Sequence, residues 1–134
     1  MNCLSALQYA VEILKVKHVI VCGHYGCGGV KAALESQPHG LIDNWLRNIR
    51  DIHQRRASEL LQFSNAEERI DRLCELNVIE QVKNVGNTTI IQEAWQAGQM
   101  VTIHGWIYAI SNGLLKDLDA CASSIDELTR LENL

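Results

Sequence analysis

The sequence predicts an α/β fold, in which part of a mostly parallel β-sheet is flanked by helices. Two observations predict it. Short β-branched apolar runs, typical of strands, alternate with longer stretches whose apolar residues recur at helical spacing. The composition is that of a folded chain, because 47% of the 134 residues are hydrophobic and only one is proline. We therefore expect a single domain over residues 1–134.

Helical spacing of apolar residues marks most of the chain outside the apolar runs. Ser5 is the expected N-cap of the first helix. Pro38 ends a helix that starts in a glycine-rich turn, and Gly98 ends another. The predicted helices cover residues 5–16, 28–34, 41–56, 65–84, 88–97 and, more weakly, 124–131.

Two short apolar runs, residues 18–23 and 100–106, predict buried strands. Residues 107–118 predict a further strand with a turn at Asn112-Gly113. Both convincing strands are expected to be buried on two faces, yet so small a sheet cannot give each strand a neighbour on either side. We therefore expect that the domain is completed by another chain or that the sequence lacks a piece.

Composition excludes several classes of protein. Sixteen acidic residues outnumber 12 basic ones, and this balance argues against nucleic-acid binding. No run approaches the roughly 20 apolar residues of a membrane span, and no signal peptide is visible, so a cytoplasmic location is expected. The five cysteines form no disulfide framework. Most of them, including Cys22 in the first strand, are expected to be small core residues.

The stretch from Cys22 to Gly29 carries the predicted chemistry. His24 and Cys27 offer a nitrogen and a sulfur donor at the carboxyl end of a predicted strand, where open α/β sheets bind ligands. Gly28 and Gly29 would expose backbone amides beside anything bound there. Neither Gly-x-Gly-x-x-Gly nor a Walker lysine follows, so a nucleotide loop is disfavoured. Zinc takes four ligands, or three and a water, so two donors are too few to identify a zinc site. Two interpretations of His24 and Cys27 therefore stay open, a zinc site and an incidental spacing.

Residues 22–30 resemble the second zinc motif of the β-class carbonic anhydrases, in particular of a bacterial, bicarbonate-regulated subgroup. The resemblance implies that His24 and Cys27 are two of the four protein ligands of Zn²⁺ and that the backbone of Gly28 and Gly29 lines the substrate pocket. Other stretches that resemble the family are 8–11, 40–46, 49–52, 74–82 and 104–108.

The resemblance implies a zinc-dependent carbonate dehydratase, a lyase that reversibly hydrates carbon dioxide to bicarbonate by zinc-bound hydroxide. It also implies a homo-oligomer, a dimer or a tetramer. The family's other two ligands come from an upstream Cys-x-Asp-x-Arg segment, which this sequence lacks. No catalytic residue is assigned, because the family's Asp–Arg pair is absent. We expect an N-terminally truncated domain that binds little zinc and is impaired alone.

Two alternatives stay open beside the enzyme. One is a catalytically inactive remnant that acts only through oligomerisation. The other is a redox or metal-storage module built on Cys22 and Cys27, which the Cys-x4-Cys spacing disfavours. The resemblance also implies a regulatory bicarbonate site at Tyr108. Its tryptophan and arginine partners are missing here, so a tyrosine packed at a strand end is the preferred interpretation.

Overall fold

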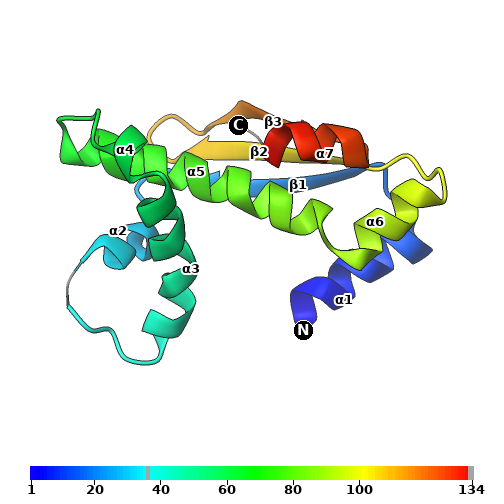
Figure 1. The fold of residues 1–134 in the computed structure, drawn as a ribbon, viewed down its shortest axis with the longest axis horizontal. Helices are drawn as coiled ribbons and strands as arrows, with labels where there is room; N and C mark the ends of the chain where they lie inside the picture. Colours follow the sequence, from blue (N-terminus) through cyan, green and yellow to red (C-terminus); the bar gives the residue numbers. More distant parts are fainter. Residues whose placement is uncertain (36, 133–134) are drawn as a thin grey trace. The chain divides into compact units, whose positions relative to one another are not determined.

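The structure, a computed structural model, describes residues 1–35 and 37–132 and confirms the α/β prediction (Figure 1). Its described strands are β1 His18–His24, β2 Thr102–Ala109 and β3 Leu114–Ala122. Its described helices are α1 Asn2–Gln8, the π-helical turn η1 Tyr9–Ile13, α2 Gly28–Leu34, α3 Ile42–Arg55, α4 Ala57–Leu60, α5 Ala66–Gly86, α6 Thr89–Gln96 and α7 Ile125–Glu132.

The chain divides into two compact units. Unit 1 comprises Met1–Val21, Gln81–Trp106 and Asp117–Leu134, and unit 2 comprises Cys22–Glu80 and Ile107–Lys116. Each strand, and also α5, contributes residues to both units. The single domain expected over residues 1–134 stays a prediction.

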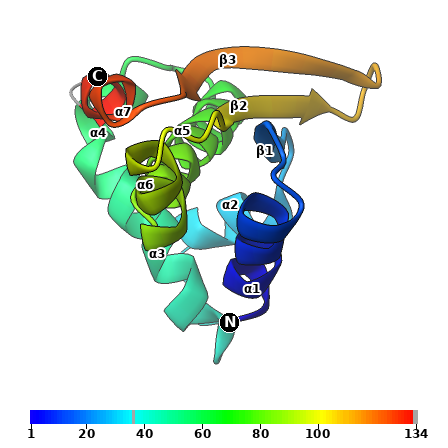
Figure 2. The same ribbon diagram turned by 90° about the vertical axis from the view of Figure 1, so that its right-hand side faces the viewer.

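The described strands form one mixed sheet in the order β1-β2-β3, with β1 and β3 at its edges (Figure 2). A tight turn joins the antiparallel pair β2 and β3. Gly113 has a φ of +73°, and the Leu114 amide donates to Asn112 Oδ1 at 3.0 Å. This geometry confirms the turn predicted at Asn112-Gly113, because such a φ favours glycine. β1 is the parallel neighbour of β2.

Neither predicted strand is buried on two faces, so that prediction was wrong. Along β2, Ile103, Gly105 and Ile107 are buried, while the residues between them are half-buried. Along β1, His18 and Ile20 are exposed and the alternate residues are half-buried. Successive side chains of a strand point to opposite faces, and the described residues leave one face of β1 open.

The cysteines also correct the sequence prediction. Cys74 is 3% exposed and lies in the core of unit 2, as expected for a small apolar side chain. Cys22, Cys3 and Cys121 are exposed. The reason for Cys22 is the open face of β1, to which its side chain belongs.

The first helix begins earlier than predicted. It starts at Asn2, and Ser5 lies within it, where its hydroxyl donates to the Met1 carbonyl at 3.2 Å. Ser5 is therefore not an N-cap; its hydroxyl bonds back to the preceding turn. Thr88 is a true cap, because its hydroxyl accepts from the Ile91 amide at the start of α6. Gly98, with a φ of +75°, ends that helix as predicted.

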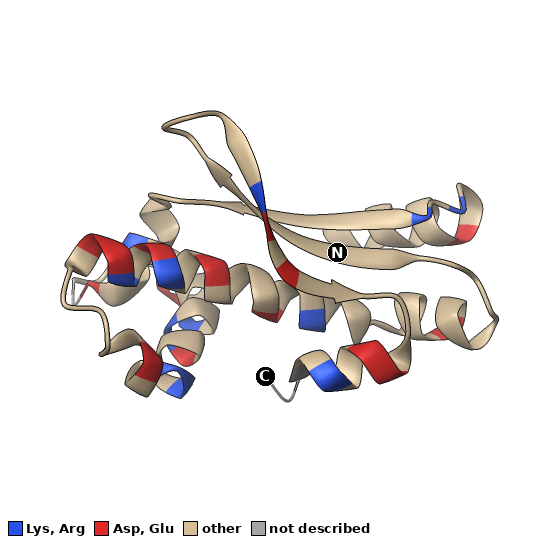
Figure 3. Cartoon of the chain, turned by 90° about the horizontal axis from the view of Figure 1, so that it is seen from above, with Lys and Arg blue, Asp and Glu red and all other residues tan. Residues whose placement is uncertain are grey.

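The remaining helices follow the predicted periodicity closely. The apolar spacing that predicted α3 reflects its buried face of Leu46, Ile49 and Ile52. The short helix α4 was not predicted, because four residues are too few to show a helical period. No helix within the described residues is both long and apolar enough to cross a bilayer. Figure 3 shows the charged residues on the helices and on β3, whereas β1 and β2 carry none.

The N-terminal helical segment of unit 1 buries one side and exposes another. Val11 is fully buried, and its carbonyl accepts from Gln99 Nε2 at 2.9 Å, which holds η1 against the end of α6. The apolar side chains on its other side are 49–63% exposed: Leu4, Tyr9, Ile13 and Leu14. An apolar face of this kind is typical of a surface that associates with another chain.

We predict that this face drives self-association. The double variant Ile13→Lys/Leu14→Lys should shift the light-scattering mass toward that of a monomer, because it places charge on the apolar face. Glu12→Lys is the matched control, since it changes the net charge of the exposed segment by the same +2 and removes no apolar group. A monodisperse monomer for the unmodified chain would contradict this prediction.

Candidate functional site

The predicted ligands lie on one tight turn of unit 2, between β1 and α2. His24 is the last residue of β1, and Cys27 is the N-cap of α2. Gly26 lies between them with a φ of +66°, a conformation that side-chain-bearing residues rarely adopt. The Lys31 amide donates to the Cys27 carbonyl at 3.0 Å and closes the first turn of α2. The structure thus confirms that the pair lies at a strand end and a helix start.

The His24 imidazole has a defined partner. Its Nδ1 lies 2.9 Å from the Tyr25 carbonyl oxygen. A carbonyl can only accept, so this contact is a hydrogen bond when Nδ1 carries the proton. In the neutral ring, Nε2 then keeps its lone pair. Histidines that ligate metals typically donate their other ring nitrogen in this way, so Nε2 is the nitrogen available to a metal.

The Cys27 thiol lies beside the two glycines that follow it. A Cβ added to Gly29 would lie 3.8 Å from Cys27 Sγ and 3.3 Å from the Trp45 ring. The absence of a side chain at Gly29 therefore lets the indole lie close to the turn. A Cβ at Gly28 would meet no atom within 4 Å. The backbone of Gly28 consequently borders open space, as its predicted place in a substrate pocket requires.

Cys74 supports the same turn from α5. Burial raises the pKa of its thiol to about 11, and a hydrogen bond with the Cys27 backbone opposes that shift only in part. The Cys74 sulfur therefore remains a neutral thiol at ordinary pH. The side chain packs behind the turn as a small buried group.

The described residues contain no group of three or more His, Cys, Asp or Glu side chains that could hold a metal ion. The side chains of His18 and His104 contact each other. Their ring nitrogens, Nδ1 and Nε2 respectively, lie 3.0 Å apart in unit 1. The His104 ring thus has a hydrogen-bonding partner and is half-buried.

Tyr108, the predicted regulatory residue, is hydrogen-bonded through its backbone to the turn that carries His24 and Cys27. Its carbonyl accepts from the Tyr25 amide at 3.0 Å. Its hydroxyl lies 3.7 Å from the position of a Cβ on Gly113, over the hairpin turn. The residue is 38% exposed, so its ring is not a core side chain.

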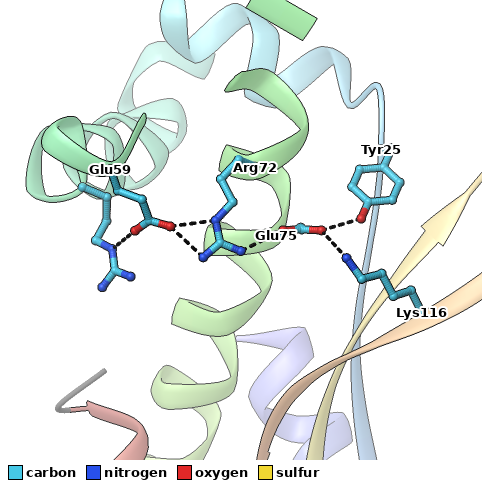
Figure 4. Close-up of polar contacts among 6 residues, drawn as sticks. Tyr25, Glu59, Arg72, Glu75 and Lys116 are labelled. Atoms are coloured by element: carbon cyan, nitrogen blue, oxygen red, sulfur yellow. Dashed lines mark hydrogen bonds and ion pairs between the residues drawn. The ribbon is translucent and has the colours of Figure 1, made fainter. Parts of the chain in front are cut away.

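The structure adds a cluster that the sequence did not predict. Glu75 of α5 is the buried charged residue among the described side chains, with 9% exposure. Three donors from separate segments converge on its carboxylate (Figure 4). Tyr25 donates to Oε1 at 2.5 Å, Lys116 donates to Oε1 at 3.0 Å, and Arg72 donates to Oε2 at 2.8 Å.

The cluster continues along α5 and α4. Arg72 also donates through Nε to Glu59 Oε1 at 2.7 Å, and Arg56 donates to Glu59 Oε2 at 2.8 Å. These groups border an open depression of about 530 Å³. Its lining residues are Tyr25, Glu59, Gln62, Phe63, Glu68, Asp71, Arg72 and Glu75.

Burial and hydrogen bonds set the ionisation states of Glu75 and Tyr25 in this cluster. Burial alone would raise the pKa of Glu75, but the hydrogen bonds from Tyr25, Arg72 and Lys116 outweigh it and lower that pKa. Burial, followed by the bond to Glu75, raises the pKa of Tyr25. Glu75 is therefore ionised and Tyr25 protonated at neutral pH, which is the pairing that the hydrogen bond requires.

Comparison with known sequences relates this site to one family. A family model described as carbonic anhydrase matches residues 1–115. A carbonic anhydrase of Emericella nidulans is 44% identical over 119 residues, covering 89% of this chain and 52% of the relative. One of Pseudomonas aeruginosa is 28% identical over 123 residues, covering 88% of this chain and 54% of the relative. The chain spans about half the length of these curated relatives.

Solved structures agree with the sequences. A Coccomyxa β-carbonic anhydrase in complex with acetazolamide matches with a TM-score of 0.89 and 37% identity, covering 96% of this chain and 59% of that one. A structure of tetrameric β-carbonic anhydrases from Sordaria macrospora matches with a TM-score of 0.83 and 34% identity, covering 90% and 61%. The shared fold thus extends over nearly all of this chain.

We predict that Glu75→Ala lowers the free energy of unfolding by about 2 kcal/mol at pH 7, because three donors lose a charged acceptor. The loss should be smaller than the roughly 3–5 kcal/mol of a fully buried pair, since Arg72 keeps Glu59 and Lys116 is exposed. Urea unfolding measures the difference, and Glu93→Ala on the exposed side of α6 is the control.

The same comparison has a predicted pH dependence. A carboxyl group whose pKa is lower in the folded state stabilises the fold above its unfolded pKa, and this contribution is lost as the pH falls through the folded pKa. The gap between the unmodified chain and Glu75→Ala should therefore narrow as the pH falls below 4.5, the ordinary value for glutamate. A gap that stays constant with pH would refute this account of Glu75.

Proposed function

The chain belongs to the β class of the carbonic anhydrase family, and we propose that it serves the zinc-dependent, reversible hydration of carbon dioxide to bicarbonate. We propose that His24 and Cys27 are the metal ligands this chain supplies, and that the remaining ligands come from outside its described residues. Because the chain spans about half the length of its relatives, the activity is proposed for an assembly in which the ligand set is complete.

One observation carries this proposal: the hydrogen-bonding state of His24. Its Nδ1 faces the Tyr25 carbonyl, so the ring directs its unprotonated nitrogen away from that contact. Cys27 follows three residues later at the N-cap of α2, across a turn that Gly26 makes possible. An imidazole nitrogen and a thiolate sulfur are the donors that zinc prefers.

These residues fit zinc as half of a ligand set. Bound zinc supplies the Lewis acidity that makes water a nucleophile near neutral pH. The chain's own contribution is to orient the two donors and to border the reaction space with the backbone of Gly28 and Gly29. A small substrate needs such open backbone, and nothing lies within 4 Å of a Cβ position at Gly28. Carbon dioxide, a small linear molecule, would find room beside this open backbone.

We also propose an oligomeric state, a regulatory residue and a cellular location. A homo-oligomer, dimer or tetramer, is supported by the exposed apolar side of α1 and η1 and by the tetrameric relatives from Sordaria macrospora. A bicarbonate-regulatory role for Tyr108 is supported by its exposure and by its backbone bond to Tyr25. A cytoplasmic location stays a prediction from the sequence, and cell fractionation tests it.

We predict that the chain alone binds well below one zinc per molecule and gives negligible carbon dioxide hydration, because two donors hold the metal weakly. Zinc content after dialysis and stopped-flow hydration measure this. His24→Ala and Cys27→Ala should each abolish the residual zinc, whereas the control Cys121→Ser, at an exposed cysteine, should not. Stoichiometric zinc together with a hydration rate well above that of buffer would refute the prediction that this chain alone has too few ligands to hold zinc.

The missing ligands offer a second test. Co-expression with a segment that carries Cys-x-Asp-x-Arg should raise both the zinc content and the hydration rate. This gain should depend on His24 and Cys27. No gain in a stable complex would favour the alternative function, a catalytically inactive chain that acts only through oligomerisation.

A further inference from the structure

We propose that Tyr25 and Glu75 are positioning residues for His24: their hydrogen bond fixes the Tyr25 peptide, whose carbonyl holds the imidazole with Nε2 free for a ligand. The inference deepens the proposed function and rests on it only where metal is concerned. The state of the ring that it describes belongs to the protein without metal. Neither residue is a metal donor in this arrangement, since both act through the backbone next to His24.

The partner of Nδ1 decides the tautomer of the His24 ring. A neutral imidazole carries its proton on either nitrogen, and the partner of one nitrogen decides which. The observed partner is the Tyr25 carbonyl, 2.9 Å from Nδ1. If the Tyr25 peptide turned away, Nδ1 would lose its acceptor, and the tautomer with the proton on Nε2 would become populated. That tautomer offers Nδ1, which faces the turn, and so it is unsuited to a ligand on the open side.

Two hydrogen bonds hold Tyr25 in place. Tyr25 follows the last residue of β1 and precedes Gly26, whose backbone is unusually free to turn. At its amide, Tyr25 donates to the Tyr108 carbonyl at 3.0 Å. At its other end, the phenol donates to Glu75 Oε1 at 2.5 Å. The residue is thus anchored through backbone and side chain, so the direction of its carbonyl is set.

The Glu75 carboxylate, which accepts from the Tyr25 phenol, is itself held in place. Glu75 lies in the middle of α5, a rigid helix, and is 9% exposed. Arg72 and Lys116 hold its carboxylate from two other directions, at 2.8 and 3.0 Å (Figure 4). A buried carboxylate fixed in this way presents Tyr25 with an acceptor in a single position. The phenol consequently points from the end of β1 toward α5.

Imidazole nitrogen NMR on the full chain without metal tests this inference directly. The spectra are recorded at a series of alkaline pH values, and the tautomer is read where the nitrogen chemical shifts no longer change with pH. His24→Ala assigns the His24 signals among the five histidines. We expect the Nδ1–H tautomer of His24 to dominate in the unmodified chain. Tyr25→Phe, which removes only the hydroxyl, should populate the Nε2–H tautomer, and Tyr9→Phe at an exposed tyrosine should not.

A second pair of variants separates positioning from general stability. Glu75→Gln keeps an acceptor oxygen for the phenol, so this variant should largely retain the Nδ1–H tautomer of the unmodified chain. Glu75→Ala removes the acceptor and should lose that tautomer. The thermal midpoint of Tyr25→Phe should fall less than that of Glu75→Ala, because Arg72 and Lys116 still donate to the Glu75 carboxylate. If Glu75→Ala fails to fold, Tyr25→Phe still decides the matter. An unchanged tautomer in folded Tyr25→Phe would overturn the inference.

Titration of the same proteins with Co²⁺ tests whether the His24 tautomer affects metal binding. Tyr25→Phe should weaken Co²⁺ binding by about 10–100-fold, the range found when outer-shell partners of ligands are removed. If the unmodified chain binds no Co²⁺ but the tautomer still responds to Tyr25→Phe, the positioning role stands and the proposed function fails. If Co²⁺ binds through His24 and neither tautomer nor affinity responds, the proposed function stands and the positioning role fails.

Discussion

Burial of the Glu75 carboxylate is the constraint on which the site depends. A buried charge is costly unless donors surround it, and those donors must arrive with fixed geometry. Here they come from the turn after β1, from the preceding turn of α5 and from β3, as Tyr25, Arg72 and Lys116. Satisfying one carboxylate therefore fixes three segments of unit 2 around the turn that carries His24 and Cys27.

Local features of this arrangement were predictable from the sequence, and distant ones were not. The turn with His24 and Cys27, the helix α2 and the hairpin at Gly113 depend on neighbouring residues, so short patterns predict them correctly. The Glu75 cluster joins residues as far apart as Tyr25 and Lys116, and no spacing signals such a contact. One clue was present in the sequence, because Arg72 and Glu75 are three residues apart on a predicted helix.

The errors have the same origin. Cys22 and the strand faces were expected to be buried because β-branched runs are typical of core strands, but burial depends on what covers a strand. Ser5 carries the chemistry of an N-cap, yet the helix continues past it toward Met1. The metal site shows the same division. Two donors close in sequence are predicted, and we propose that the rest of the zinc site comes from beyond the described residues, which contain no group of three or more possible metal ligands.

The central claim is that this chain contributes one imidazole and one thiolate to a zinc site. X-ray absorption of the zinc-loaded chain, at a protein concentration that saturates a weak site, tests it most directly. The account predicts a single sulfur at about 2.3 Å and nitrogen or oxygen neighbours at about 2.0–2.1 Å. It also predicts that the sulfur disappears in Cys27→Ser. A site without sulfur, or one with two or more sulfurs, would contradict it.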